Sequence, residues 1–213
     1  GIKFDRVKLD LVDVGPTIKK LSNGKWDKVP TIEFSNGDIV YDSQNIANYL
    51  DIQYPSKPLK GNIPEITEFA NNFQHTFGAL AFKLVILNTL YSLDIKSQNQ
   101  MRKSRELEFG QTLEQFNSNG EATYNQIISN LQPLNEFLKY NEFIEGEEPK
   151  YCDIIVASNF QWIKILNYGL HKRLLRDLDP VVGAWFSKME RLFDGFLKGL
   201  PIVEGREFIS SKL

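Results

Sequence analysis

A change of pattern near residue 57 constrains the fold of this chain more than any other feature of its sequence. Before it, apolar residues fall in short runs separated by turn-forming residues; after it, they recur every three or four positions over long stretches. Residues 54–64, where the two patterns meet, contain three prolines and one glycine, which is the composition of a linker. We therefore expect two domains, residues 1–57 and residues 58–213.

The first domain is expected to contain a strand, a helix, a hairpin and a second helix. Apolar and charged residues alternate over residues 2–9, which predicts a strand. Residues 16–21 predict a short helix with Pro16 in its first turn. The second helix is expected to begin at Asp42-Ser43, because a capping residue precedes an apolar stripe at helical spacing there.

The predicted hairpin lies between these two helices. Residues 31–34 and 39–41 are short runs of residues that favour strands. Asn36-Gly37 separates them and is the strongest short hairpin signal in the chain. The two runs are therefore expected to pair as neighbouring strands.

Beyond the linker the sequence predicts helices throughout. Apolar residues recur at helical spacing in four stripes, over residues 66–91, 124–138, 151–166 and 180–196. The second stripe is expected to bend at Pro133. The third is apolar nearly all round, so this helix should lie buried at the centre of its domain.

Charge and composition exclude several classes of function. The formal net charge of −2 gives no reason to expect nucleic acid or a membrane surface as a partner. The single cysteine, Cys152, excludes an intrachain disulfide, fits a reducing, cytoplasmic compartment, and is expected to be a core residue rather than a nucleophile. No apolar run approaches the roughly 18 residues that span a bilayer. His75 and His171, the only histidines, lie far apart, which leaves a metal site or a catalytic triad without support.

Three motifs of the first domain resemble those of the glutathione transferases. Residues 28–33 (KVPTIE), Asn36-Gly37 and residues 42–50 (DSQNIANYL) match a pattern of Val-Pro before a strand, a hairpin, and acidic-Ser-x-x-Ile-x-x-Tyr-Leu on a helix. Further segments are similar to fungal and bacterial etherase-like members, at residues 1–4, 105–114 and 149–155. The resemblance covers the whole chain. It implies an α/β, thioredoxin-like glutathione-binding domain followed by an all-helical C-terminal domain.

The resemblance gives Val29-Pro30 a specific role. It implies a cis bond before Pro30, with the main-chain N–H and C=O of Val29 turned outward. These groups would pair, as a strand does, with the cysteinyl peptide of glutathione, the co-substrate. The plain alternative is that Pro30 merely starts an edge strand.

Asp42 and Ser43 also have two interpretations that are compatible with each other. They are expected to cap a helix, which stabilises it by about 1 kcal/mol. The same helix end is a carboxylate site, and the resemblance implies that Ser43 donates to the γ-glutamyl carboxylate of glutathione while Asp42 pairs with its α-ammonium group. Lys28 would face the glycine carboxylate or a dimer partner.

The catalytic residue of the family is not identified in this sequence. In glutathione transferases a Ser, Tyr or Cys after the first strand stabilises the glutathione thiolate, whereas residues 1–4 match the second strand. The first domain is therefore expected to be N-terminally incomplete. Either the chain is a fragment that lacks roughly 20 residues, the length of a strand and a short helix, or it is a degenerate paralogue that no longer catalyses.

Three functions follow from these observations. The first is conjugation of glutathione to a hydrophobic electrophile by a homodimeric enzyme, with the electrophile between the domains against the long helix that carries Phe69, Phe73 and Phe77. Most of these three aromatics are expected to be core residues. The second is a non-catalytic ligand-binding or protein-interaction module of the same fold. The third, a helical scaffold without ligand, leaves the pattern at residues 28–50 unexplained.

A capping pattern at the start of the third stripe is incomplete. Asp153 matches the acidic end of a Ser/Thr-x-x-Asp capping box, but Lys150 occupies the capping position and cannot accept from helix N–H groups. This departure should cost about 1 kcal/mol of folding stability.

Overall fold

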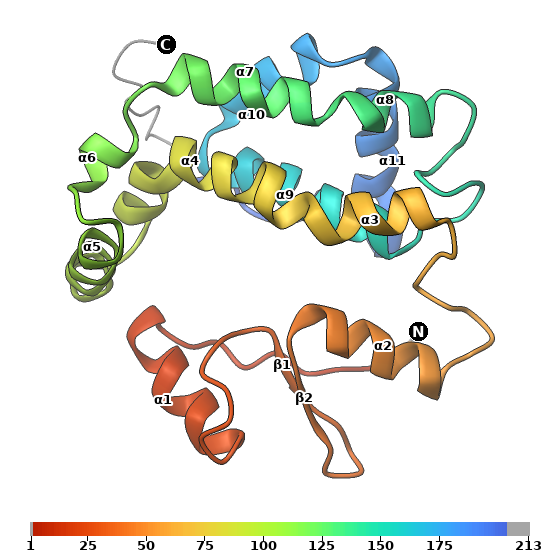
Figure 1. The fold of residues 1–213 in the computed structure, drawn as a ribbon. Coiled ribbons are helices and arrows are strands. Elements are labelled where there is room, and N and C mark those ends of the chain that lie inside the picture. The colour runs from red at the N-terminus through yellow and green to blue at the C-terminus, as the bar shows by residue number, and fades with distance from the viewer. Residues whose placement is uncertain (1, 204–213) are drawn as a thin grey trace.

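The computed structural model describes residues 2–203, which form two groups of elements linked by residues 54–63 (Figure 1). We call residues 2–57 the N-terminal region and residues 64–203 the helical region. The N-terminal region contains α1 (Leu11–Leu21), β1 (Thr31–Glu33), β2 (Ile39–Tyr41) and α2 (Ser43–Gln53).

The predicted hairpin is confirmed. Strands β1 and β2 pair antiparallel, with Ile32 opposite Val40. The turn is closed by the N–H of Phe34, which donates to the carbonyl of Asp38 at 2.8 Å. Gly37 has a φ of 87°, a conformation that its lack of a Cβ makes accessible.

For the first 21 residues, the predicted strand is wrong, and the predicted helix over residues 16–21 is confirmed but starts earlier than expected. Residues 2–9 form no strand, because no neighbouring strand lies beside them in the described part of the chain; Phe4 and Val7 are 73% and 83% exposed. Alternation alone does not supply a ladder partner. Helix α1 begins at Leu11, so Pro16 lies inside it, where the missing N–H removes one hydrogen bond rather than marking the start.

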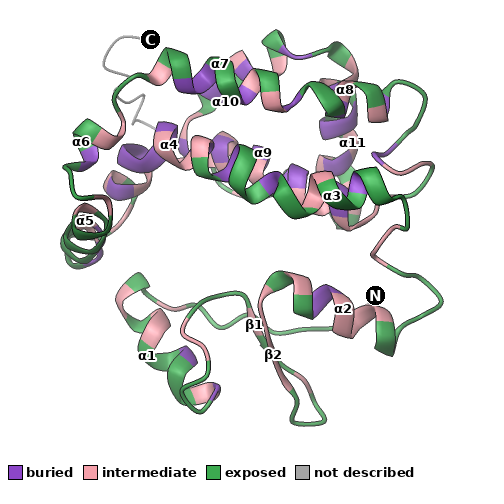
Figure 2. Cartoon of the chain, in the orientation of Figure 1, coloured by how far each residue is buried: buried purple, intermediate pink, exposed green. Residues whose placement is uncertain are grey.

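The helical region is all-helical as predicted. Its elements are α3 (Pro64–Phe73), the π-helix η1 (Gln74–Gly78), α4 (Ala79–Ser92), α5 (Ile95–Phe109), α6 (Leu113–Phe116), α7 (Gly120–Asn130), α8 (Gln132–Leu138), α9 (Tyr151–Leu166), α10 (Tyr168–Asp177) and α11 (Pro180–Gly195). Helix α9 packs against α3, α4, α10 and α11, which confirms its central position. The buried residues concentrate in this region (Figure 2). Non-helical dihedrals at 192–194 interrupt the end of α11.

Two of the long stripes depart from regular α-helix where the sequence predicted continuity or a bend. The first stripe is one long helix whose middle widens into the π-turn η1. There the side chain of Asn130 donates to the carbonyl of Thr76 at 2.6 Å, outside the regular helical pattern. The second stripe ends at Leu131 and restarts as α8, with Pro133 in the first turn instead of at a bend.

A buried carboxylate fixes the start of α9. Asp153 is fully buried and accepts hydrogen bonds from the N–H groups of Lys150 and Ile144, each at 2.9 Å, and from the indole of Trp185 at 2.8 Å. The bond from Lys150 is the acidic half of the predicted capping box. Burial raises the pKa of the Asp153 carboxyl. The ammonium group of Lys150 donates instead to the carbonyl of Pro58, at 3.2 Å.

Candidate functional site

The main chain at Val29 lies beside the start of α2. The N–H of Asp42 donates to the carbonyl of Pro30 at 3.3 Å, just beyond the strand ladder, which begins at Thr31. Val29 is therefore outside the ladder, and its N–H and C=O have no hydrogen-bond partner within residues 2–203. Its side chain is 60% exposed, and the Val29-Pro30 peptide bond is cis.

Asp42 caps α2 from a left-handed backbone conformation. Its Oδ1 accepts from the N–H groups of Gln44 and Asn45, at 3.0 and 3.3 Å, while its φ is 71°. Oδ2 has no hydrogen bond to any described residue. The N–H of Ser43 likewise lacks a partner in the described part of the chain, and Ser43 is exposed. This helix end thus offers one free N–H, a hydroxyl and a carboxylate oxygen to a ligand.

The tip of α2 lies near the start of α9. Burial raises the pKa of the phenol of Tyr151, the first residue of α9, while nearby Ser43 lowers it and the charge of Asp42 raises it. The net direction is upward, so the phenol is neutral at physiological pH. Tyr151 was not predicted as a site residue, although it lies in residues 149–155, one of the segments that carried the resemblance.

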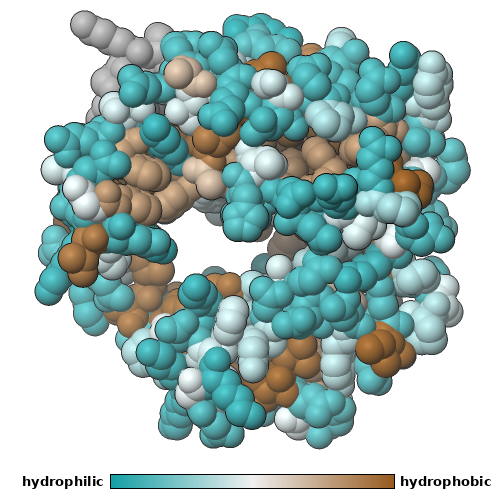
Figure 3. Space-filling model, in the orientation of Figure 1, coloured by the Kyte–Doolittle hydropathy of each residue, from teal (hydrophilic) through white to brown (hydrophobic). Residues whose placement is uncertain are grey.

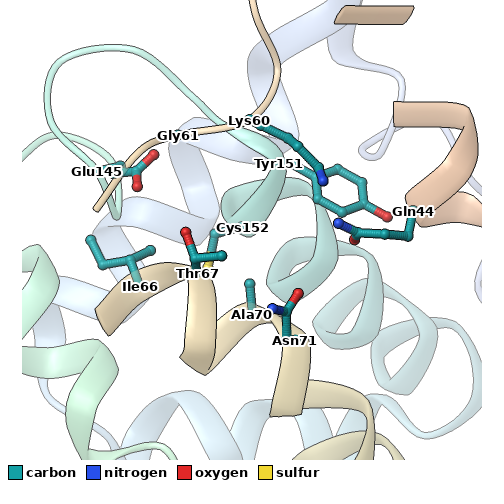
Figure 4. A pocket seen from close by; sticks show the side chains of 10 residues that line it. All are labelled: Gln44, Lys60, Gly61, Ile66, Thr67, Ala70, Asn71, Glu145, Tyr151 and Cys152. Carbon is teal, nitrogen blue, oxygen red and sulfur yellow. The ribbon is translucent and has the colours of Figure 1, made fainter. Parts of the chain in front are cut away.

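A small cavity of about 50 Å³ adjoins Tyr151 (Figure 4). It is enclosed by the starts of α2, α3 and α9 and by the linker; the residues around it are Gln44, Lys60, Gly61, Ile66, Thr67, Ala70, Asn71, Glu145, Tyr151 and Cys152. The volume suits a few water molecules and is far too small for a tripeptide. Burial raises the pKa of the Cys152 thiol, so this cysteine is an unreactive core residue, as expected.

Lys28 lies on the same loop as Val29 but is engaged with an aromatic ring. Its ammonium nitrogen is 5.9 Å from the centroid of Trp26, and that ring stacks on Tyr41 at 5.1 Å. The carbonyl of Lys28 accepts from the hydroxyl of Thr31 at 2.9 Å. The structure therefore brings four of the five proposed site residues close together through the bond between Pro30 and Asp42, with Lys28 adjacent in the chain.

The expectation that most of Phe69, Phe73 and Phe77 are core residues is confirmed, so they do not line an electrophile site. Phe73 and Phe77 are fully buried and stack on each other at 4.8 Å, and Phe69 packs edge-on against Phe137 of α8 at 5.4 Å. Their spacing of four residues places all three on the inner face of the long helix, so they belong to the core.

Other aromatic residues do remain accessible. We call the half-buried Phe82, Phe109, Phe116 and Trp162 the Phe82 patch. Phe82 of α4 stacks on Trp162 of α9 at 6.1 Å and approaches the other two rings at 6.5 and 6.4 Å. In the space-filling view an opening separates the N-terminal and helical regions, and hydrophobic residues gather on its border over α1 and α4 (Figure 3).

Neither a metal site nor a membrane span is found in the described part of the chain. Residues 2–203 contain no group of three or more His, Cys, Asp or Glu side chains placed to hold an ion. Among the helices described, none is both long and apolar enough to cross a bilayer.

Comparisons with known proteins agree on one family. The family model described as "Glutathione S-transferase, C-terminal domain" matches residues 67–192. Glutathione S-transferase D7 of Drosophila melanogaster is 24% identical over 212 residues, which cover 95% of this chain and 81% of that protein.

Two solved structures show the same architecture. Glutathione transferase GSTFuA2 from Phanerochaete chrysosporium has a TM-score of 0.76 and 25% identity, over 89% of this chain and 85% of that one. The glutathione S-transferase CsGST83044 of Ceriporiopsis subvermispora, solved in complex with glutathione, has a TM-score of 0.71 and 19% identity, over 92% and 85%. The second likeness concerns the fold alone.

Proposed function

This chain belongs to the glutathione S-transferase family, with a thioredoxin-like N-terminal part and the family's helical C-terminal domain, and on that premise we propose that it binds glutathione and transfers its sulfur to a hydrophobic electrophile. The observation that carries the proposal is the free main chain of Val29 beside the open tip of α2. A peptide ligand needs an exposed, unpaired backbone segment to pair with, and a carboxylate needs free donors. Both lie together here.

The proposed binding mode assigns one part of glutathione to each group. The N–H and C=O of Val29, next to Pro30, pair with the cysteinyl unit. The hydroxyl and N–H of Ser43 donate to the γ-glutamyl carboxylate, and the free Oδ2 of Asp42 accepts from the α-ammonium group. Lys28 would have to leave the ring of Trp26 to reach the glycine carboxylate or a partner subunit.

The proposed reaction is attack by the glutathione thiolate on an electrophilic carbon. A sulfur–carbon bond forms, and the leaving group departs with the electron pair of the bond that breaks. With an activated double bond, the π bond breaks instead and its electron pair takes up a proton from water. No residue of this chain is assigned to stabilise the thiolate. The Phe82 patch is the proposed surface for the electrophile, in place of the buried phenylalanines, because its rings are accessible. The same proposal includes etherase-like chemistry and a role in detoxification. It also includes a homodimer located in the cytoplasm.

The proposal is tested by measuring glutathione affinity calorimetrically for the wild type and Ser43→Ala. Because a hydrogen bond to a charged group contributes about 1.5–3 kcal/mol, the variant should bind about 10- to 100-fold more weakly. Ser35→Ala, in the exposed hairpin turn, is the matched control and should bind like the wild type. Wild-type affinity in Ser43→Ala would contradict the assigned site.

Catalysis is tested separately with an aryl halide as the electrophile. Conjugation that depends on both enzyme and glutathione supports the transferase. Glutathione binding without conjugation would favour the second candidate, a non-catalytic module of the same fold.

A further inference from the structure

We infer that Lys60, in the linker, is a further glutathione-binding residue, whose ammonium group is the counter-charge for the γ-glutamyl carboxylate at the tip of α2. This inference rests on the proposed function and deepens it, since it adds the linker to the site for the γ-glutamyl end. It starts from a shortage of positive charge at that tip. Helix α2 contains no Lys, Arg or His, and Asp42 places a carboxylate at its start.

The proposed binding mode leaves the γ-glutamyl carboxylate without a cation. The α-ammonium group of the ligand pairs with Asp42, and Lys28 is assigned to the glycine carboxylate at the other end of the peptide. The carboxylate is then held by Ser43 and the end of the helix dipole, which supplies only about half an elementary charge. The nearby charge of Asp42 repels it. A cation from a neighbouring segment would therefore strengthen binding.

The linker brings Lys60 to this end of α2. The main-chain N–H of Lys60 donates to the carboxylate of Asp51 at 3.0 Å, so the backbone of the lysine is fixed relative to the helix. Its side chain borders the same cavity as Gln44, the residue that follows Ser43. In the close-up view it extends from the linker towards Gln44, with its ammonium nitrogen beside the ring of Tyr151 (Figure 4).

The ammonium group of Lys60 is also unpaired. It makes no ion pair or hydrogen bond with any residue in the range 2–203, although the lysine is half-buried. Glu145 contributes the carboxylate that borders the cavity, but its Oε1 accepts from the N–H of Ile63 at 3.1 Å, and the carboxylate lies against Gly61. A half-buried cation without a partner has more to gain from an anionic ligand than a paired one.

The test matches the lysine with the carboxylate that it would bind. The ligands are glutathione and 4-aminobutanoyl-cysteinylglycine, which differs from glutathione only in lacking the γ-glutamyl carboxylate. Both affinities are measured calorimetrically for the wild type, Lys60→Gln and the control Lys57→Gln, which changes an exposed lysine of the same linker. We expect Lys60→Gln to bind glutathione about fivefold more weakly and to bind the analogue like the wild type. Lys57→Gln should match the wild type for both ligands.

Ionic strength and a charge-preserving variant separate charge pairing from a structural role. Because salt screens charges that solvent reaches, added salt should weaken glutathione binding less in Lys60→Gln than in the wild type. Lys60→Arg keeps the charge and should keep most of the wild-type affinity. The main-chain bond to Asp51 is retained in both variants, so their thermal midpoints should stay near that of the wild type.

The outcomes distinguish this inference from the proposed function. Equal losses for the two ligands, or a wild-type salt dependence in Lys60→Gln, would overturn the role of the lysine. Unchanged glutathione binding by Lys60→Gln would overturn it too, while leaving the proposed function intact. A wild type that fails to bind glutathione removes both.

Discussion

The helical region fully buries side chains as large as Trp185 and Phe160, whereas the N-terminal region buries only three described apolar side chains, Ile18, Ile46 and Ala47. The helical region therefore has a large apolar core, and the N-terminal region has almost none. Hydrophobic burial contributes roughly 25 cal/mol for each Å² removed from water, so this contrast implies a large difference in intrinsic stability. The proposed ligand-binding groups lie mainly in the region with the smaller core.

This contrast gives the two regions different roles in the proposed site. The exposed backbone and helix tip of the N-terminal region are available to a ligand because little packs against them. Their geometry is then set through the linker, because Leu59 bonds both to Asp51 of α2 and to the main-chain N–H of Tyr151 in the helical region. The regions should accordingly respond differently to substitution.

The largest effect is expected from Asp153→Ala. The substitution leaves the N–H groups of Ile144 and Lys150 and the buried indole of Trp185 without their acceptor. Unfolding free energy should fall by about 3–5 kcal/mol, as measured by urea denaturation monitored by tryptophan fluorescence. Glu147→Ala, at an exposed position, is the control and should be near neutral. A loss below about 1 kcal/mol for Asp153→Ala would contradict the central role given to this carboxylate.

The next effect concerns the pH dependence of the helical region. Burial lowers the pKa of His171 from 6.5 to about 4, with Lys164 adding to the shift and Glu190 opposing it. The unfolded chain therefore binds a proton near pH 6.5 that the folded chain does not take up until about pH 4. Stability is fully present above pH 6.5 and is lost as the pH falls to about 4, by about 3 kcal/mol in total.

The comparison of His171→Phe with the wild type isolates this contribution. Stability is measured by denaturation at several pH values from 7 to 4. The variant should lose less stability than the wild type as the pH falls, whatever its absolute stability. His75→Gln, which removes the exposed histidine of η1, should keep the wild-type slope. Parallel slopes for His171→Phe and the wild type would show that another group is responsible.

The smallest effect is expected in the N-terminal region, from Asp42→Ala. Loss of the cap should destabilise the start of α2 by about 1 kcal/mol. Hydrogen exchange should quicken at the amides of Gln44 and Asn45 and stay unchanged in α9. Asp42→Asn keeps an acceptor and tolerates the positive φ, so it should retain the slow exchange while weakening glutathione binding. Faster exchange throughout α9 would mean that α2 does not open independently of the helical region.

The sequence predicted the elements whose signal is local. The limits of α9 were predicted correctly because residues 151–166 are apolar on nearly all sides, and the hairpin because Asn36-Gly37 favours a tight turn. The alternating pattern of residues 2–9 was misleading, since a strand also requires a neighbour. The π-turn η1 was not predicted, because Phe73 and Phe77 keep a helical spacing through it.

The candidate site was only partly predictable for a similar reason. Asp42 and Ser43 follow each other in the chain and cap a helix, so a local motif is enough to find them. The nearness of Tyr151 to the tip of α2 depends on how two distant segments approach in three dimensions, and no pattern in the sequence encodes that distance. The domain boundary at residue 57 and the ligand roles of the site residues stay predictions.

The two hydrogen bonds from Leu59 and Lys60 to Asp51 have a consequence for motion. A proline-rich connection between two regions would ordinarily allow them to swing about it. Here any such rotation must first break these bonds, together with the one between the Tyr151 N–H and Leu59. The connection is thereby immobilised at its midpoint, and the width of the opening between the two regions should vary little in solution.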